Sequence, residues 1–180
     1  MKKLLKLKEL KKLFLLFPIL LLISCAVKVK TVNDSFYGTQ HYETSYMTII
    51  GWSYDVKVRF IASKNPNVIL VEVQYIANDG FTISKNDGII LKFSDDSLLN
   101  LIYINDMPAV DRSFYTSYYG SVYSSSSYTI NAAARVNNDI GTLTAIRIEN
   151  SGGFKNLDIS QSFAKKFQKA YNDIKNKINE

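Results

Sequence analysis

The sequence has only one cysteine and one histidine among its 180 residues. A single cysteine excludes an intramolecular disulfide, so a folded domain here must be stabilised by its hydrophobic core. One histidine and one cysteine are also too few to complete a typical zinc site. The sequence contains no glycine-rich phosphate-binding loop of the Gly-x-x-x-x-Gly-Lys or Gly-x-Gly-x-x-Gly type. We therefore predict no metal ion and no other cofactor.

The apolar run near the amino terminus is too short to cross a membrane as a helix. Leu13–Ile23 has eleven uncharged residues, whereas a spanning helix needs about 20. This run follows a basic segment, Met1–Lys12. A basic region followed by a short apolar region is typical of a secretory signal peptide, and we expect residues 1–24 to form one.

The apolar run ends in Leu22-Ile23-Ser24-Cys25, with an aliphatic residue three positions before the cysteine and a small residue directly before it. This pattern resembles the lipobox of bacterial lipoproteins. The resemblance implies that the signal peptidase recognises Leu22, Ile23 and Ser24, and that Cys25 carries a diacylglycerol and usually a third acyl chain. Several chains hold a protein at a membrane where one is marginal. The alternatives are an ordinary signal peptide with a chance cysteine, and a transmembrane anchor.

The residues after the cysteine predict where the protein is held. In lipoproteins of two-membrane bacteria, an acidic residue after the lipidated cysteine favours the inner membrane. Ala26 stands there instead, which points to the outer membrane without indicating the leaflet. Residues 25–35 are polar or mixed and predict a lipidated cysteine with a flexible tether. The remaining residues, 36–180, are enough for one domain with its own core.

The basic character of the chain is concentrated in the predicted signal peptide. Removing its six lysines and one glutamate leaves 16 basic and 15 acidic residues, a net charge near +1. Binding to nucleic acid depends on clustered positive charge on the folded domain. We therefore predict no nucleic-acid partner.

Alternation of apolar and polar residues dominates the chain from Thr44 onward. This period of two predicts β-strands with one buried face. Asn, Asp and Gly clusters between the apolar segments are typical of tight turns. The fold class expected is mainly β: an antiparallel β-sandwich or a partly open barrel. The strands expected are Tyr54–Phe60, Val68–Ala77, Ile89–Phe93, Leu98–Ile104, Tyr128–Val136 and Ala145–Glu149.

The period changes near the carboxyl terminus and predicts one amphipathic helix over about residues 159–179. Its apolar side chains fall within about an 80° arc at 100° per residue, and Asp158 or Ser160 is suited to cap its start. We expect the apolar side to pack on the sheet; the alternative is contact with a membrane surface. The arc consists of Phe163, Phe167, Tyr171, Ile174 and Ile178.

Enzyme signals are nearly absent from the sequence. His41 is the only histidine, so a Ser-His-Asp arrangement would have to use it, and no Gly-x-Ser-x-Gly elbow accompanies it. Asp95-Asp96 and Asn105-Asp106 offer oxygen ligands but lack the order of a common calcium loop, and they are interpreted as turns. We therefore predict no catalytic residues and no enzyme activity.

Ser113–Tyr128 is unusually rich in tyrosine and serine and carries no charge. Tyrosine offers a large contact area at low entropic cost, and serine offers adaptable hydrogen bonds, so the segment suits recognition of a partner. The alternative is an edge strand followed by a loop at Ser124–Ser127, with the tyrosines half-buried on the sheet. The residues predicted to bind a partner are Tyr115, Tyr118, Tyr119 and Tyr123.

Taken as a whole, the expected domain is similar to small envelope lipoproteins of Gram-negative bacteria in which β-strands precede a closing helix. That resemblance implies a non-catalytic binding or structural module at the membrane, whose partner is an envelope protein or a glycan. The alternative is a lipid-anchored envelope hydrolase with a site that the sequence conceals.

The anchor leads to a direct prediction, because only the thiol of Cys25 can accept the diacylglycerol. The variant C25A should remain an uncleaved precursor or behave as a soluble protein, as measured by membrane fractionation and by mass. A C25A protein that still fractionates with the outer membrane and has the mature mass would contradict the lipobox assignment.

Overall fold

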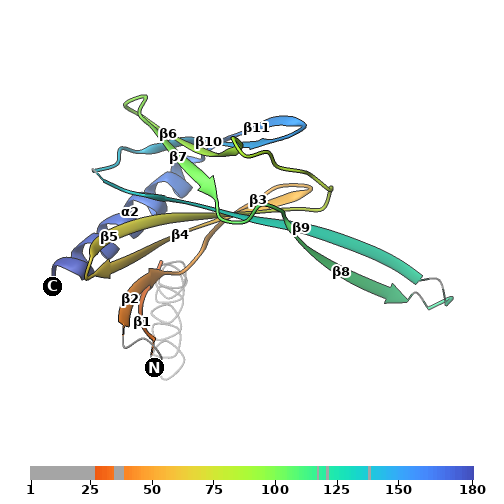
Figure 1. Ribbon diagram of the computed structural model, residues 1–180, viewed down its shortest axis with the longest axis horizontal. Coiled ribbons are helices and arrows are strands. Elements are labelled where there is room, and N and C mark those ends of the chain that lie inside the picture. The colour runs from red at the N-terminus through yellow and green to blue at the C-terminus, as the bar shows by residue number, and fades with distance from the viewer. Residues whose placement is uncertain (1–26, 35–38, 117, 121, 138) are drawn as a thin grey trace, which may run out of the picture.

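The computed structural model describes residues 27–34, 39–116, 118–120, 122–137 and 139–180 (Figure 1). The expected signal peptide, its recognition residues Leu22, Ile23 and Ser24, and the lipidation site Cys25 lie outside the described residues. The described part is mainly antiparallel β with one carboxyl-terminal helix packed on it. This confirms the predicted fold class.

All strands of the described residues belong to one sheet of 11 strands. In chain order they are β1 (Val29–Asp34), β2 (Thr39–Thr44), β3 (Met47–Ile50), β4 (Tyr54–Lys64), β5 (Asn67–Ala77), β6 (Gly88–Phe93), β7 (Leu98–Tyr103), β8 (Ala109–Thr116), β9 (Val122–Arg135), β10 (Leu143–Asn150) and β11 (Gly153–Asp158). They line up as β1-β2-β4-β5-β9-β7-β6-β10-β11, with β3 paired to β4 and β8 paired to β9.

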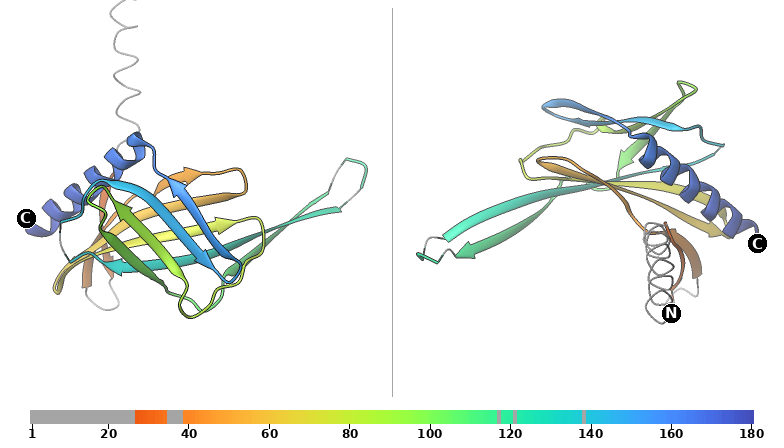
Figure 2. Two further views of the ribbon diagram at one scale, coloured as in Figure 1. Left: turned by 90° about the horizontal axis from the view of Figure 1, so that it is seen from above. Right: turned by 180° about the vertical axis from the view of Figure 1, so that it is seen from behind.

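The sheet folds over on itself, so that its two halves face each other (Figure 2). One half contains β4 and β5, and the other contains β6, β10 and β11. The halves are joined where β7 pairs with β9 over only two residue pairs, Ile102 with Ala133 and Tyr103 with Ala132. The result lies closer to the partly open barrel than to two separate sheets.

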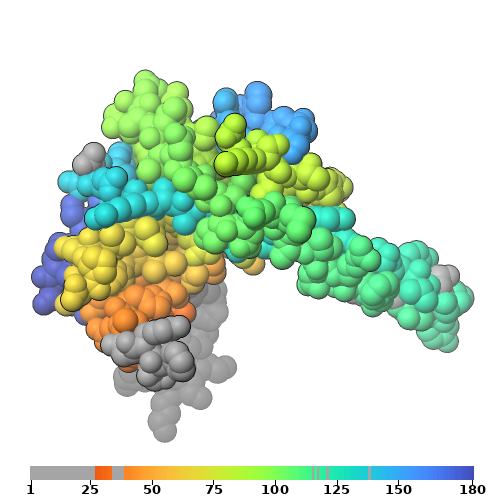
Figure 3. Space-filling model, viewed as in Figure 1, coloured from red at the N-terminus to blue at the C-terminus, as the bar shows by residue number. Residues whose placement is uncertain are grey.

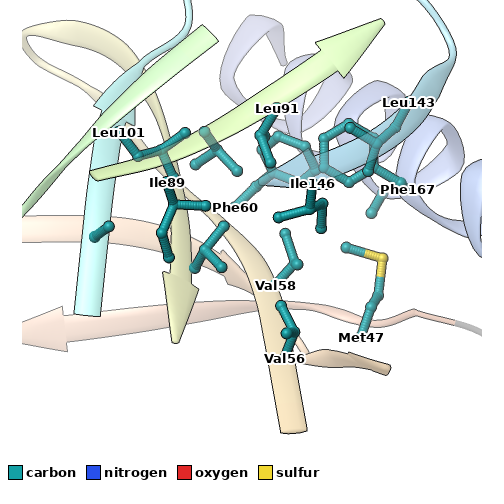
Figure 4. Close-up of a cluster of buried hydrophobic side chains, with 14 of the residues drawn as sticks. Met47, Val56, Val58, Phe60, Ile89, Leu91, Leu101, Leu143, Ile146 and Phe167 are labelled. Atoms are coloured by element: carbon teal, nitrogen blue, oxygen red, sulfur yellow. The ribbon is translucent and has the colours of Figure 1, made fainter. Parts of the chain in front are cut away.

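The core lies between the two halves (Figure 4). Val56, Val58 and Phe60 alternate along β4 and are fully buried, and Ile89 and Leu91 of β6 reach the same cluster from the other half. Burying an aliphatic or aromatic side chain of this size contributes about 1.5–3 kcal/mol. The period of two in the sequence is therefore the pattern of inward-facing residues.

The helix α2 (Gln161–Asn179) fills the concave side of the folded sheet. The Ser160 side chain accepts a hydrogen bond from the Phe163 amide and caps its start. Phe167 is fully buried, with its ring centre 4.9 Å from Phe60 and 6.4 Å from Phe93. The whole predicted apolar arc is buried: Phe163, Phe167, Tyr171, Ile174 and Ile178. This side of α2 is thus not free to lie on a membrane.

The flexible tether expected over residues 25–35 is wrong for Val29–Asp34, which form β1. This strand pairs with β2 from Val29 opposite Thr44 to Asp34 opposite Thr39. Lys30 also forms an ion pair with Glu43 at 3.0 Å, and Val27 and Val29 pack against the core. The short, charged strand shows weak alternation in the sequence because it lies at an edge of the sheet.

The loop proposed at Ser124–Ser127 is also wrong, because these four serines lie inside β9. Each is paired across to β8, from Ser124 opposite Phe114 to Ser127 opposite Asp111. Serine has modest strand propensity, and here the pairing with β8 overrides it. The segment is therefore one half of a long hairpin.

That hairpin projects far beyond the core (Figure 3). We call it the arm: all of β8 together with Val122–Ser127 of β9, and with the described tip residues Tyr118–Gly120 between them. The remainder of β9, Tyr128–Arg135, pairs with β5 inside the body. One continuous strand of 14 residues thus serves both the core and the arm.

The packing of α2 leads to a stability prediction. The variant F167A should lower the free energy of unfolding by about 3–5 kcal/mol, because it leaves a cavity beneath Phe60 and Phe93. The control K169A removes only an exposed ion pair with Asp173 and should cost less than about 0.5 kcal/mol. Chemical denaturation measures both. Equal losses from the two variants would show that the helix is not packed as described.

Candidate functional site

The arm presents the most exposed aromatic side chains of the described residues outside the turn that holds Trp52. Tyr118 and Tyr119 at the tip are 99% and 92% exposed. Their rings meet edge to face with centres 5.7 Å apart. Side chains of this size seldom remain uncovered without a function, because each carries a large apolar area.

Further large side chains line the two faces of the arm. On one face Phe114 stands opposite Ser124, next to the pair Thr116 and Val122, and Phe114 and Val122 are 70% and 68% exposed. On the other face lies Tyr123 of β9, which is 60% exposed. Both faces therefore offer contact area to a partner.

The predicted partner-binding residues are brought together by this hairpin. Tyr115 and Tyr123 are cross-strand neighbours, and Tyr118 and Tyr119 lie at the tip that joins their strands. The alternative, in which the tyrosines lie half-buried on the sheet, does not describe Tyr118, Tyr119 or Tyr123. The uncharged stretch Ser113–Ala134 covers the distal arm and continues into the body.

A pocket of about 580 Å³ lies at the base of the arm. Its walls include Tyr75, Phe81 and Tyr128, whose ring centres form a chain with spacings of 5.3 and 6.5 Å. Burial raises the pKa of Tyr75, so its hydroxyl is less acidic than that of an exposed tyrosine. Sequence reasoning missed this pocket, because its residues come from separate segments. The only local sign was Phe81, a large side chain directly after the Asn-Asp-Gly turn.

A cationic side chain stands near this pocket. Lys155 lines it, and its ammonium nitrogen lies 3.7 Å from the ring centre of Tyr54. Tyr54 in turn lies 6.2 Å from Tyr75. A cation over an aromatic face is a stabilising contact. Lys155 therefore stabilises the aromatic cluster through Tyr54 and also places a positive charge at the edge of the pocket.

His41 lies on the opposite, outward face of the sheet. Its Nε2 is 3.1 Å from Oε1 of Glu43. The strand register places Ser63 directly opposite His41, but the Ser63 hydroxyl donates a hydrogen bond to the Asn65 carbonyl. The structure thus brings histidine, carboxylate and serine onto one face without a hydrogen bond between Ser63 and His41.

Glu43 belongs to a compact network of charged side chains. Arg59 donates from Nη1 to Glu43 at 3.1 Å and from Nε to Glu72 at 2.7 Å, and both glutamates are 8% exposed. The Tyr46 hydroxyl also donates to Glu72. Each buried carboxylate of this network has a cationic partner. Since Glu43, Arg59 and Glu72 belong to β2, β4 and β5, the network links these three strands.

The environment of Glu43 changes its acidity. Burial alone would raise the pKa of Glu43, but hydrogen bonds from Lys30 and His41 and the charge of Arg59 outweigh it. The pKa of Glu43 is therefore lowered below its ordinary value of 4.5. The ionised carboxylate stabilises the folded chain.

The part of the chain that the structure describes contains neither a metal-binding cluster nor a membrane-spanning helix. No group of three or more histidine, cysteine, aspartate or glutamate side chains is placed to hold a metal ion within that part of the chain. No described helix combines the length and the apolar character needed to cross a bilayer. Comparison with protein-family models, curated proteins and solved structures gave no match.

The lowered pKa of Glu43 predicts a pH-dependent effect of E43Q. Ionised Glu43 stabilises the fold fully above the ordinary carboxyl pKa, and this contribution is lost as the pH falls through the lowered folded value. E43Q should therefore cost about 1.5–3 kcal/mol at pH 7, and the difference from wild type should shrink below about pH 4.5.

Denaturant unfolding at several pH values measures this difference. The matched control is D96N, which alters an exposed pair with Lys92 and should change stability by less than about 0.5 kcal/mol. A cost of E43Q that stays constant from pH 7 to the acid limit would refute the assignment.

Proposed function

We propose that this chain is a lipid-anchored lipoprotein of the cell envelope, that it acts as a non-catalytic binding or structural module, and that the arm is its interaction surface. The observation that carries the proposal is the arm itself: an aromatic-rich hairpin that is uncharged from Ser113 onward and held away from the core, with Tyr118 and Tyr119 almost fully exposed.

The anchor rests on the resemblance of Leu22-Ile23-Ser24-Cys25 to a lipobox. The body begins very close to this point, since Val27 already packs against the core. Only Ala26 lies between Cys25 and Val27. A lipid on Cys25 would therefore keep the folded domain close to the membrane, with little freedom to move away. Ala26 favours the outer membrane, and the leaflet is left open.

The chemistry of the arm supports a protein or a glycan as its partner. Exposed tyrosines supply contact area with few rotatable bonds, and the serines beside them supply hydrogen bonds. A few aromatic residues carry most of the energy in many interfaces. The near-neutral mature charge gives no support for a nucleic-acid partner.

The hydrolase alternative depends on His41. Its ring contacts Glu43, and Glu43 also binds Arg59 and Lys30. These contacts are those of a structural network that joins strands. The serine on the same face, Ser63, is hydrogen-bonded elsewhere. The arrangement therefore favours the non-catalytic proposal over hydrolysis.

The proposal is tested by site-specific photo-crosslinking in living cells. A crosslinking side chain at Tyr119 should capture a specific partner, whereas one at Asp96, an exposed turn residue distant in the fold, should capture none. The double variant Y118A/Y119A should abolish the capture from a crosslinker at Tyr123 without changing the melting temperature, because both side chains are exposed. Lack of any specific product at Tyr119, or a lowered melting temperature with unchanged capture, would refute the proposal.

A further inference from the structure

The pocket at the base of the arm contains a tyrosine hydroxyl that the fold leaves unused. Tyr75 lines this pocket and is only 6% exposed, and its hydroxyl forms no hydrogen bond with another described residue. Among the described side chains, no oxygen or nitrogen atom is both fully buried and without a partner. The Tyr75 hydroxyl therefore keeps contact with the space of the pocket. Polar groups in buried side chains are usually hydrogen-bonded, so this hydroxyl is a candidate contact for a ligand.

Aromatic rings line the pocket from its buried part to its rim. The ring centre of Phe81 lies 5.3 Å from that of Tyr75 and 6.5 Å from that of Tyr128, and both pairs of rings are tilted. Phe154 of β11 also lines the pocket and is 64% exposed. The guanidinium of Arg147 lies 4.5 Å from the ring centre of Phe154. A ligand in this pocket would therefore meet aromatic surface on several sides.

Polar groups from three segments line the same pocket, at the end of the body where the arm begins (Figure 2). The side-chain oxygen of Asn150 accepts a hydrogen bond from the Gly152 amide at 2.9 Å, which leaves the side-chain NH2 group as a donor. Lys155 and Asp79 also line the pocket, and neither forms an ion pair within the described part of the chain. The pocket thus offers hydrogen-bond donors and an acceptor beside its aromatic rings.

We propose that this pocket binds a neutral saccharide, with a sugar ring held between the aromatic side chains. A pyranose has a face of C–H groups, which packs on the electron-rich face of an aromatic ring. Its hydroxyls both donate and accept hydrogen bonds, and they match the Asp79 carboxylate, the Asn150 amide and the Tyr75 hydroxyl. The volume of about 580 Å³ lies within the range of about 300–1,000 Å³ that is typical of small-molecule sites. The pocket is separate from the arm tip, so this inference goes beyond the proposed function.

Other classes of small ligand fit the pocket less well. The Asp79 carboxylate repels an anion, and the Lys155 ammonium repels a cation. A purely apolar ligand would remove the Tyr75 hydroxyl from water without giving it a hydrogen bond, which is costly. A neutral ligand that carries several hydroxyls avoids all three penalties.

Calorimetric titration with defined saccharides tests the proposal. The probes are the neutral trisaccharides of glucose, galactose, mannose and N-acetylglucosamine, with trigalacturonic acid as the acidic comparison and indole as the aromatic one. The full chain is used in a detergent without a sugar headgroup, because such a headgroup would compete for the pocket. At least one neutral trisaccharide should bind at millimolar concentration, and more tightly than trigalacturonic acid or indole.

The variant Y75F removes only the hydroxyl that has no partner among the described residues. It should weaken binding of that trisaccharide by about 3–10-fold, which corresponds to the loss of one net hydrogen bond, without lowering the melting temperature. The matched control is Y42F, since Tyr42 is 5% exposed and its hydroxyl donates to Gln40 outside the pocket. Y42F should bind the trisaccharide as tightly as wild type.

A second variant tests the amide donor. N150D keeps the oxygen that accepts from the Gly152 amide but loses the NH2 group, and it should weaken binding by about 3-fold or more. The matched control N156D adds the same charge and keeps the oxygen that accepts from Arg147 outside the pocket. N156D should leave the Kd unchanged. The melting temperature of each variant shows whether its fold is intact.

The proposal is overturned if no neutral trisaccharide binds, or if Y75F or N150D binds as tightly as wild type. Tighter binding of indole would mean that the pocket receives an aromatic side chain of a partner protein, and tighter binding of trigalacturonic acid would mean an anion site. Either result also overturns the proposal. Capture of a partner by a crosslinker at Tyr119 would still support the proposed function in all these cases, because Tyr119 lies at the arm tip. Loss of that capture with intact saccharide binding would refute the proposed function alone.

Discussion

The structure depends on one requirement, that the two halves of a single folded-over sheet must bury their inner faces against each other and against one helix. Phe167 meets this requirement at the centre, between Phe60 of one half of the sheet and Phe93 of the other. Without α2, the side of the core that Phe167 closes would be open to water, and the only strand pairing between the two halves would be the short contact of β7 with β9. A domain without disulfides relies on this burial for its stability.

The strand β9 connects this stable core to the arm at the surface. Its carboxyl-terminal part is clamped between β5 and β7, and its amino-terminal part carries the arm. A strand held firmly at one end gives the hairpin a fixed direction at its base, although the distal arm has no core of its own. The arm is therefore free of packing demands, and its tyrosine and serine content is not explained by the needs of the fold.

Much of the fold could be predicted from the sequence because burial imposes a period. The side chains that face the core are indicated directly by the alternation in β4 and β5 and by the apolar arc of α2. Strands with little burial show no such period. The strands that were not expected from the pattern are β1, β2, β3 and β11. β8 in the exposed arm was expected only in the alternative that placed an edge strand before Ser124.

The candidate site also has one part that could be predicted from the sequence and one part that could not. The tyrosines of the arm could be identified because their composition is unusual over a continuous segment. The pocket of Tyr75, Phe81 and Tyr128 could not, because its residues meet only through the pairing of β5 with β9 and the path of the segment that follows β5. The tyrosines of such a segment can either cover a sheet or project away from it. Which of the two occurs depends on the register of the hairpin, and no local sequence pattern predicts that register.

The central claim is that a partner covers the arm in the assembled protein. Hydrogen exchange of the backbone amides in Ala109–Thr116 and Val122–Ser127 measures this most directly, with the protein compared in its native membrane and after extraction and dilution. We expect slower exchange in the membrane than after dilution, while the amides of β5 stay protected in both states. Equally fast exchange of the arm amides in both states would contradict the claim.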